Sequence, residues 1–213
     1  MDIAILLYDR FTALDAVGPY EVLSRLPGAT TTFVATERGP KTTDTGRLTI
    51  VADASIDDLP NPEIVVVPGG PGQNEADDDE RVLEWLRAAH ETSQWTTSVC
   101  TGSLILGAAG LLKGLDATTH WLAYDELAAH GANPTEQRVV QQGKIITAAG
   151  VSAGIDMALT LAALVAGDQF AQCIQLGIEY DPQPPFNAGS PSKAPADIVE
   201  LMRNMSRFVL EGT

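Results

Sequence analysis

The sequence Trp95-Thr96-Thr97-Ser98-Val99-Cys100-Thr101-Gly102-Ser103-Leu104 contains the pattern that decides the fold. A run of β-forming residues ends at Cys100, and a helix of small residues, predicted over 102–110, begins at once. A strand that turns this tightly into a helix is typical of a nucleophile elbow, which exposes one side chain above the sheet. Backbone N–H groups at the helix start would favour the thiolate over the thiol. The pattern also fits a cysteine that is only a small buried apolar residue, so both interpretations stay open.

The stretches on either side of the elbow alternate between strands and helices. Strands are predicted over 2–8, 31–36, 48–51, 63–67, 95–100 and 117–121, with a turn at 37–40 and a β-hairpin over 138–147 that turns at Gln142-Gly143. Helices are predicted over 12–23, 81–91, 102–110, 155–166, 169–180 and 196–210, with one more ending at 129. This alternation predicts a single domain over 1–213, an α/β three-layer sandwich with a mostly parallel sheet.

Small residues indicate where backbones pack closely. Glycines and alanines crowd residues 148–154, before the apolar helix predicted over 155–166, and we expect this helix to pack against the one that follows Cys100. The next helix carries Cys173, which we expect on a packed face. His90 and His130 lie near helix ends in polar surroundings and are expected to be exposed.

Charge and cysteine content exclude several classes of function. The chain has 28 acidic and 13 basic residues, and a net charge of −15 repels phosphate backbones and anionic lipids. We therefore expect no nucleic acid and no membrane among its partners. No apolar stretch approaches the ~18 residues that span a bilayer, and the first residues lack the features of a signal peptide. Cys100 and Cys173 form no disulfide framework, so we expect a reducing, cytoplasmic location.

Asp15 lies just beyond the carboxyl end of the first predicted strand, where open α/β sheets keep their sites. Thr12 lies three residues before Asp15, and this spacing also fits a variant of the capping box. In that case the Asp15 carboxylate would only satisfy N–H groups at a helix start. The residues alone leave both roles open.

The loop Pro68-Gly69-Gly70-Pro71-Gly72 follows a buried strand. It lacks the Gly-Lys-Ser/Thr of a phosphate loop, so that interpretation is rejected. Either it presents a backbone N–H that holds a developing anion, or it is only a tight turn. His120 is open in the same way, because a cysteine nucleophile often recruits a histidine base, whereas a structural histidine under the elbow fits slightly better. The three histidines lack ligand spacing, and we expect no metal and no cofactor.

Four segments together resemble the ThiJ/PfpI superfamily of class I glutamine amidotransferase-like proteins. They are Leu14-Asp15-Ala16-Val17-Gly18-Pro19-Tyr20-Glu21, the loop at 68–72, Val99-Cys100-Thr101-Gly102 and Thr119-His120-Trp121. The resemblance runs the full length of the chain and implies a flavodoxin-like sandwich that forms a homodimer. Transcription regulators that share this domain add a helix-turn-helix module, for which this sequence has neither the length nor a basic patch.

Within the superfamily the chain is most similar to isonitrile hydratases. Asp15 stands where the deglycase and chaperone branches usually have glutamate, and Thr101 stands where many branches have alanine or histidine. The segment 179–186 is also similar to isonitrile hydratase sequences.

The resemblance implies a role for each candidate residue. Cys100 would attack the carbon of a small isonitrile to form a thioimidate, with Asp15 as general acid and base. Thr101 would supply a hydroxyl, and its N–H would form an anion-holding pair with that of Gly70, while His120 would support the site from behind. The alternatives are a glyoxalase or deglycase acting on methylglyoxal, or a redox-sensing, chaperone-like stress protein that uses Cys100 as an oxidation switch.

Overall fold

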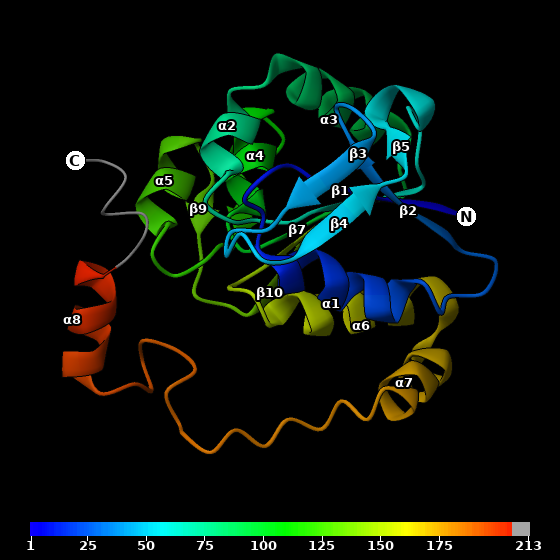
Figure 1. Cartoon of the computed structure of the whole chain (residues 1–213). Helices are drawn as coiled ribbons and strands as arrows, with labels where there is room; N and C mark the ends of the chain where they lie inside the picture. Colours follow the sequence, from blue (N-terminus) through cyan, green and yellow to red (C-terminus); the bar gives the residue numbers. More distant parts are fainter. Residues whose placement is uncertain (206–213) are drawn as a thin grey trace.

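Seven strands form the central sheet in the order β10-β11-β7-β6-β1-β2-β5 (Figure 1). Their bounds are β1 (Asp2–Leu6), β2 (Thr30–Ala35), β5 (Ala54–Ser55), β6 (Ile64–Val67), β7 (Trp95–Val99), β10 (Val139–Gln142) and β11 (Ile145–Ala148). Every neighbouring pair is parallel except β10 and β11, which form the predicted hairpin. The protein is represented by a computed structural model that describes residues 1–205. The predicted mostly parallel sheet is confirmed.

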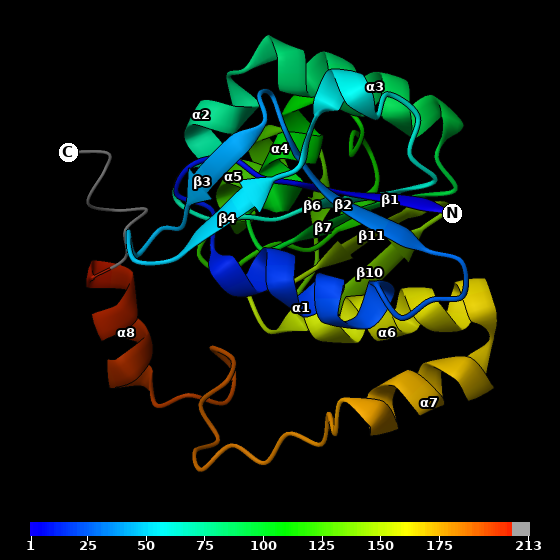
Figure 2. The same ribbon diagram turned by 45° about the vertical axis from the view of Figure 1, so that its right-hand side comes forward.

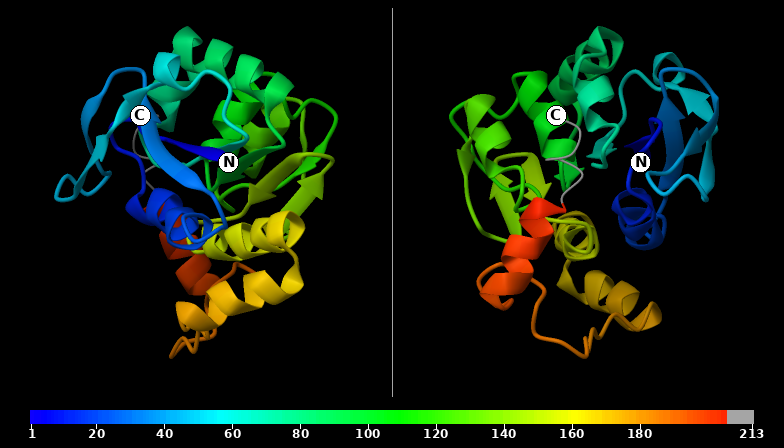
Figure 3. Two further views of the ribbon diagram at one scale, coloured as in Figure 1. Left: turned by 90° about the vertical axis from the view of Figure 1, so that its right-hand side faces the viewer. Right: turned by 60° about the vertical axis from the view of Figure 1, so that its left-hand side comes forward.

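Helices cover both faces of this sheet (Figures 2 and 3). One face carries α1 (Ala13–Leu23) and α6 (Ala153–Ala166), with α7 (Asp168–Gly177) packed on α6. The other face carries α2 (Gln73–Asp77), α3 (Glu80–Thr92), α4 (Gly102–Ala108) and α5 (Tyr124–Ala129). This is the predicted three-layer α/β sandwich. In the described residues, no helix has both the length and the apolar composition needed to cross a bilayer.

Strand β1 shows why the central strands read as continuous apolar runs. Ile3 and Ile5 enter the core under α1 and α6, while Ala4 and Leu6 enter the core under α3 and α4, and all four are fully buried. Because side chains alternate along a strand, a sheet covered on both faces needs an apolar residue at every position.

Some short elements differ from the sequence prediction. Residues 37–40, expected to be a turn, overlap β3 (Gly39–Thr42), which pairs with β4 (Thr49–Ala52) in a separate antiparallel ribbon. Of the segment 117–121, only its first residue is extended, in β8 (Asp116–Ala117), which pairs with β9 (Asn133–Pro134). The helix predicted over 196–210 is observed as α8 (Ala196–Asn204), and residues 206–210 lie outside the described residues.

Two packing predictions are wrong. Helix α6 packs against α1 instead of α4, because α4 and α6 lie on opposite faces of the sheet. The close approach that its small residues permit is to the sheet and to α1, since a Cβ on Gly154 would lie 3.1 Å from Val99 and 3.3 Å from Pro19. Cys173 is exposed, because Ala171 and Ile174 form the buried face of α7.

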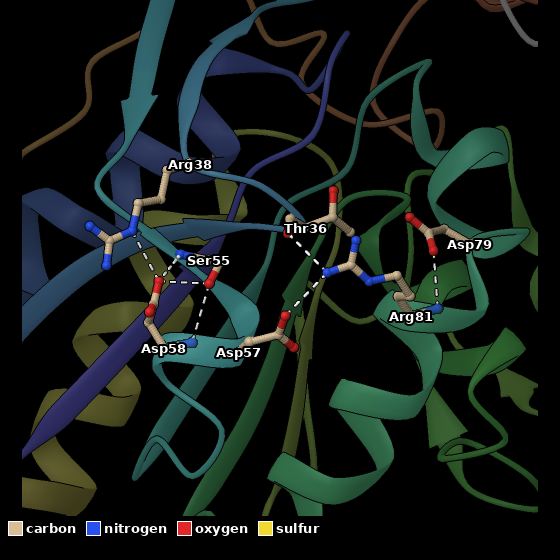
Figure 4. Close-up of polar contacts among 7 residues, drawn as sticks. All are labelled: Thr36, Arg38, Ser55, Asp57, Asp58, Asp79 and Arg81. Carbon is tan, nitrogen blue, oxygen red and sulfur yellow. Dashed lines mark hydrogen bonds and ion pairs between the residues drawn. The ribbon is translucent and has the colours of Figure 1, made fainter.

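Surface ion pairs join the short 3-10 helix η1 (Ile56–Asp58) to its neighbours (Figure 4). Asp58 accepts hydrogen bonds from Arg38 and from Ser55, which lower the pKa of its carboxyl. Arg81 reaches Asp57 over 3.2 Å and also donates to the carbonyl of Thr36. These contacts tie the end of β2, η1 and the start of α3 together.

Candidate active site

Cys100 stands at a sharp turn between β7 and α4. Its φ of +56° lies in the left-handed region, which is unusual for a residue with a side chain and typical of a nucleophile elbow. The turn needs glycine beyond the cysteine, because a Cβ on Gly102 would lie 2.1 Å from the carbonyl oxygen of Val67. The predicted strand, cysteine and helix are therefore present with the backbone geometry of an elbow.

The structure brings Asp15 to Cys100. Both residues are buried, Asp15 completely and Cys100 with 4% of its surface exposed. Asp15 Oδ2 accepts a 2.9 Å hydrogen bond from the Gly69 N–H, and the Cys100 thiol interacts with the same carboxyl. Within residues 1–205, Asp15 Oδ1 has no partner of good hydrogen-bond geometry. The Gly69 N–H therefore fixes Oδ2 of the carboxyl, and Oδ1 is available to exchange a proton or to accept a hydrogen bond.

The capping-box interpretation of Asp15 is wrong. Thr12 precedes α1, but its side chain makes no capping bond and instead donates to Asp44 Oδ2 at 2.9 Å. Asp15 faces the loop after β6, which lies 54 residues away in sequence, instead of the N–H groups of its own helix.

Burial is the largest cause of the raised pKa values of Asp15 and Cys100. Removal from water raises the pKa of Asp15 from 3.8 to about 7, although the Gly69 N–H and the thiol oppose the shift. Burial and the nearby Asp15 charge also raise the pKa of Cys100 well above its ordinary value. The sequence predicted that the helix start would favour the thiolate. Instead the thiol keeps its proton next to an ionisable carboxyl, so the two side chains titrate as one coupled unit.

Two backbone N–H groups lie at the sulfur and lower the Cys100 pKa against those effects. They belong to Thr101, which follows the cysteine, and to Val151, in the turn before α6. The sequence analysis paired Thr101 with Gly70. In the structure the Gly70 N–H donates to Thr101 Oγ1 at 3.0 Å, so Gly70 holds the threonine hydroxyl in place. Val151 carried no recognisable signal in the sequence, because only the parallel pairing of β11 with β7 brings it near the elbow.

The Pro68–Gly72 loop packs so closely against its neighbours that no side chain fits at Gly69 or Gly70. A Cβ on Gly69 would lie 2.4 Å from Thr101 N, and one on Gly70, whose φ is +137°, would lie 2.5 Å from Thr12 N. Glycine is therefore required at both positions for the loop to reach Asp15 and Thr101. Tyr8 also holds this loop, since its hydroxyl donates to the Pro68 carbonyl at 2.8 Å.

His120 lies beside the turn between β11 and α6. Its ring packs on Gly150, where an added Cβ would lie 2.9 Å from His120 Cδ2, and its Nδ1 accepts from the Leu122 N–H. The neighbouring Thr119, which the sequence analysis quoted but gave no role, donates from Oγ1 to the Cys100 carbonyl at 3.0 Å. The segment 119–121 thus supports the strained turn.

The other histidines and acidic residues do not gather into a second centre. His90 and His130 are half-buried instead of exposed, and His90 Nδ1 lies 2.9 Å from Thr96 Oγ1. Among residues 1–205, no three histidine, cysteine, aspartate or glutamate side chains form a group that could hold a metal ion.

Both the sequence and the fold match known proteins. The profile of the DJ-1/PfpI family matches residues 1–164. The isonitrile hydratase of Pseudomonas putida is 43% identical over 203 residues, which cover 95% of this chain and 89% of that protein. A crystal structure of a ThiJ/PfpI family protein from Pseudomonas syringae, 44% identical, superposes with a TM-score of 0.93 over 96% of this chain and 85% of that one.

A transcriptional regulator also matches. The regulator GbdR of Pseudomonas aeruginosa is 30% identical over 187 residues, or 84% of this chain, and the chain spans half of that protein's length. Proteins named for different functions, a hydratase and a transcriptional regulator, therefore match this chain.

Proposed function

The chain belongs to the DJ-1/PfpI family, and on that premise we propose that it is an isonitrile hydratase, which converts R–N≡C and water into the formamide R–NH–CHO. The observation that carries the proposal is the buried Asp15–Cys100 pair, in which a nucleophile and a proton carrier share one site. The 43% identity to the Pseudomonas putida isonitrile hydratase supports the same reaction.

In the first step the thiol adds across the isonitrile carbon. Ionised Asp15 accepts the Cys100 proton, the thiolate forms the S–C bond, and protonated Asp15 returns the proton to the same carbon. The product is a thioimidate, R–N=CH–S–Cys100, and no proton is gained or lost overall. Because the pKa of Asp15 is about 7, this carboxyl both accepts and donates a proton at neutral pH.

In the second step water displaces the cysteine. Asp15 takes a proton from water as the water oxygen attacks the thioimidate carbon, and passes this proton to the nitrogen, which gives R–NH–CH(OH)–S–Cys100. The C–S bond of this adduct then breaks, and Asp15 carries the hydroxyl proton to the departing sulfur, which releases R–NH–CHO and restores the Cys100 thiol. The two steps replace one high barrier by two lower ones.

The N–H groups of Thr101 and Val151 stabilise negative charge on sulfur in both steps. They point at the sulfur before reaction begins, so no reorganisation is needed when charge develops. The Thr101 hydroxyl, fixed by Gly70, lies at the same elbow and can orient the attacking water.

The test is formamide production from one alkyl and one aryl isonitrile. We expect turnover by the wild-type chain and by Cys173→Ala, whose thiol is exposed on α7 and serves as the matched control. We expect none from Cys100→Ala or Asp15→Asn. Turnover by either of these variants at the wild-type rate contradicts the mechanism. Methylglyoxal consumption, measured with the same preparations, detects the glyoxalase alternative.

A further inference from the structure

Tyr8 lies just beyond β1, and the backbone on each side of it is fixed. The Leu7 N–H donates to the Val34 carbonyl of β2 at 2.6 Å, and Asp9 Oδ1 accepts a 3.0 Å hydrogen bond from the Thr42 N–H of β3. Strand β1 itself lies inside the sheet, between β2 and β6. The half-buried Tyr8 side chain therefore starts from a fixed position next to the loop that follows β6.

The Tyr8 hydroxyl and the Asp15 carboxyl bind the two ends of one peptide group. The hydroxyl donates to the Pro68 carbonyl oxygen at 2.8 Å, and the Gly69 N–H donates to Asp15 Oδ2 at 2.9 Å. The Pro68 C=O and the Gly69 N–H belong to the same peptide, and because this peptide is trans they point in opposite directions. Tyr8 and Asp15 therefore lie on opposite sides of the Pro68–Gly69 peptide and are joined by two hydrogen bonds in series.

The next peptide of the loop is held in the same way. The Gly69 carbonyl accepts a 2.8 Å hydrogen bond from the Thr12 N–H, and the Gly70 N–H donates to Thr101 Oγ1 at 3.0 Å. Each of these two successive peptides thus receives a hydrogen bond on its C=O and gives one to a site residue from its N–H. The donor to the Gly69 carbonyl is a backbone group, whereas the donor to the Pro68 carbonyl is a side chain. A substitution can therefore change the hydrogen bond to Pro68 alone.

A hydrogen bond to a peptide oxygen changes what the same peptide does at its N–H. It polarises the amide and strengthens the N–H as a donor, by about 10–30% per bond. A stronger donor to a carboxylate favours the ionised form of that carboxylate. The Gly69 N–H lowers the pKa of Asp15 against the larger effect of burial. The Tyr8 hydroxyl strengthens this contribution from the far side of the peptide.

The titratable groups around Asp15 come from several parts of the fold. The Cys100 thiol lowers the pKa of Asp15 through its hydrogen bond, whereas the charge of Asp44, between β3 and β4, raises it. Tyr8 itself keeps its proton, because burial and then the charges of Asp15, Cys100 and Asp77 raise the pKa of Tyr8 well above its ordinary value. The Tyr8 hydroxyl therefore remains a donor over the whole pH range in which Asp15 titrates.

We infer that Tyr8 is a positioning residue of the site: its hydroxyl fixes and polarises the Pro68–Gly69 peptide, so that the Gly69 N–H holds Asp15 and favours its ionised form. The hydroxyl has a single proton, which it donates to the Pro68 carbonyl, so Tyr8 gives no proton to the substrate. The inference deepens the proposed function and rests on it for its role in catalysis, because ionised Asp15 accepts the Cys100 proton in that reaction. The titration of Asp15 tests the inference whatever the substrate is.

The direct test is NMR titration of Asp15 in chains labelled with ¹³C at the aspartate carboxyls. The signal that is missing from Asp15→Asn identifies this residue. Tyr8→Phe keeps the ring and removes the hydroxyl, and it should raise the pKa of Asp15 by about 0.5 pH unit above the wild-type value of about 7. Replacement of Tyr8 by 3-fluorotyrosine, whose hydroxyl is more acidic and therefore a stronger donor, should lower the pKa of Asp15. A role of Tyr8 in packing alone would not produce these opposite shifts.

Tyr20→Phe is the matched control. It removes the hydroxyl of an exposed tyrosine on α1 whose ring stacks on Phe33, and it should leave the titration of Asp15 unchanged. Circular dichroism checks that each variant is folded. A second readout is the pH profile of kcat/KM for isonitrile hydration, whose rise should move to higher pH in Tyr8→Phe by the same amount as the pKa of Asp15.

The outcomes separate this inference from the proposed reaction. Opposite shifts of the Asp15 titration support the role of Tyr8 even if no isonitrile is hydrated, in which case only the proposed reaction is refuted. An Asp15 pKa that is the same in the wild type and in Tyr8→Phe overturns the inference. It is also overturned if 3-fluorotyrosine at position 8 fails to lower this pKa.

Discussion

Replacement of Asp15 by asparagine keeps the shape of a completely buried side chain and removes its charge. The pKa of this carboxyl rises from 3.8 to about 7 on folding because the ionised form loses its hydration. Between these two pH values the folded chain holds one proton more than the unfolded chain at this position. The free energy of unfolding contributed by Asp15 therefore falls as pH rises, by up to about 1.4 kcal/mol per pH unit.

Over these roughly three pH units, the free energy of unfolding of the wild type falls by about 4 kcal/mol, and that of the variant does not, because asparagine does not titrate. The asparagine amide oxygen can still accept the Gly69 N–H, so the variant retains the hydrogen bond that positions the loop. We therefore expect the free energy of unfolding of Asp15→Asn minus that of the wild type to increase by about 4 kcal/mol from pH 4 to pH 7 and to remain constant above pH 7.

Urea unfolding followed by circular dichroism at pH 4.5, 5.5, 6.5, 7.5 and 8.5 measures this difference, with both proteins at one concentration so that any association affects them equally. Subtraction removes the titration of all other groups. Asp181→Asn, which makes the same substitution at an exposed position beyond α7, is the control for the loss of a carboxyl as such. If the Asp15→Asn difference is constant across this range, burial does not raise the pKa of the Asp15 carboxyl and the reasoning is refuted.

Three further substitutions or titrations test the site. The value of kcat/KM for isonitrile hydration should rise about tenfold per pH unit up to about pH 7 and then level, because Asp15 must be ionised to take the Cys100 proton; a flat profile between pH 5 and 7 would exclude this. Gly69→Ala should abolish activity and lower the melting temperature, since its Cβ would meet Thr101 N at 2.4 Å, and wild-type behaviour in both assays would show that the loop does not need this approach. Thr119→Val should cost about 1 kcal/mol of stability, because it removes one of the two hydroxyls that donate to the Cys100 carbonyl and leaves that of Ser103. Thr119→Ser should retain most of this stability, as denaturant midpoints will show.

Local sequence determined the architecture because its physical causes are local. An apolar run such as that of β1 is stable only between two covered faces, and the residue order around Cys100 allows only a tight turn into a helix. The family resemblance rests on short segments of sequence, and that resemblance implied the pairing of Asp15 with Cys100, whereas the residues alone left the role of Asp15 open.

Only the tertiary structure decided what those residues do to one another. The sequence suggested a thiolate from the helix start, but burial and the nearby carboxyl keep the proton on Cys100, and neither effect has a pattern along the chain. Gly70 proved to hold the Thr101 hydroxyl, while Val151 reaches the sulfur from a turn 51 residues further on because β11 lies beside β7. Residue types determine which chemistry is available, but a pKa and a hydrogen-bond partner depend on neighbours that the fold alone brings together.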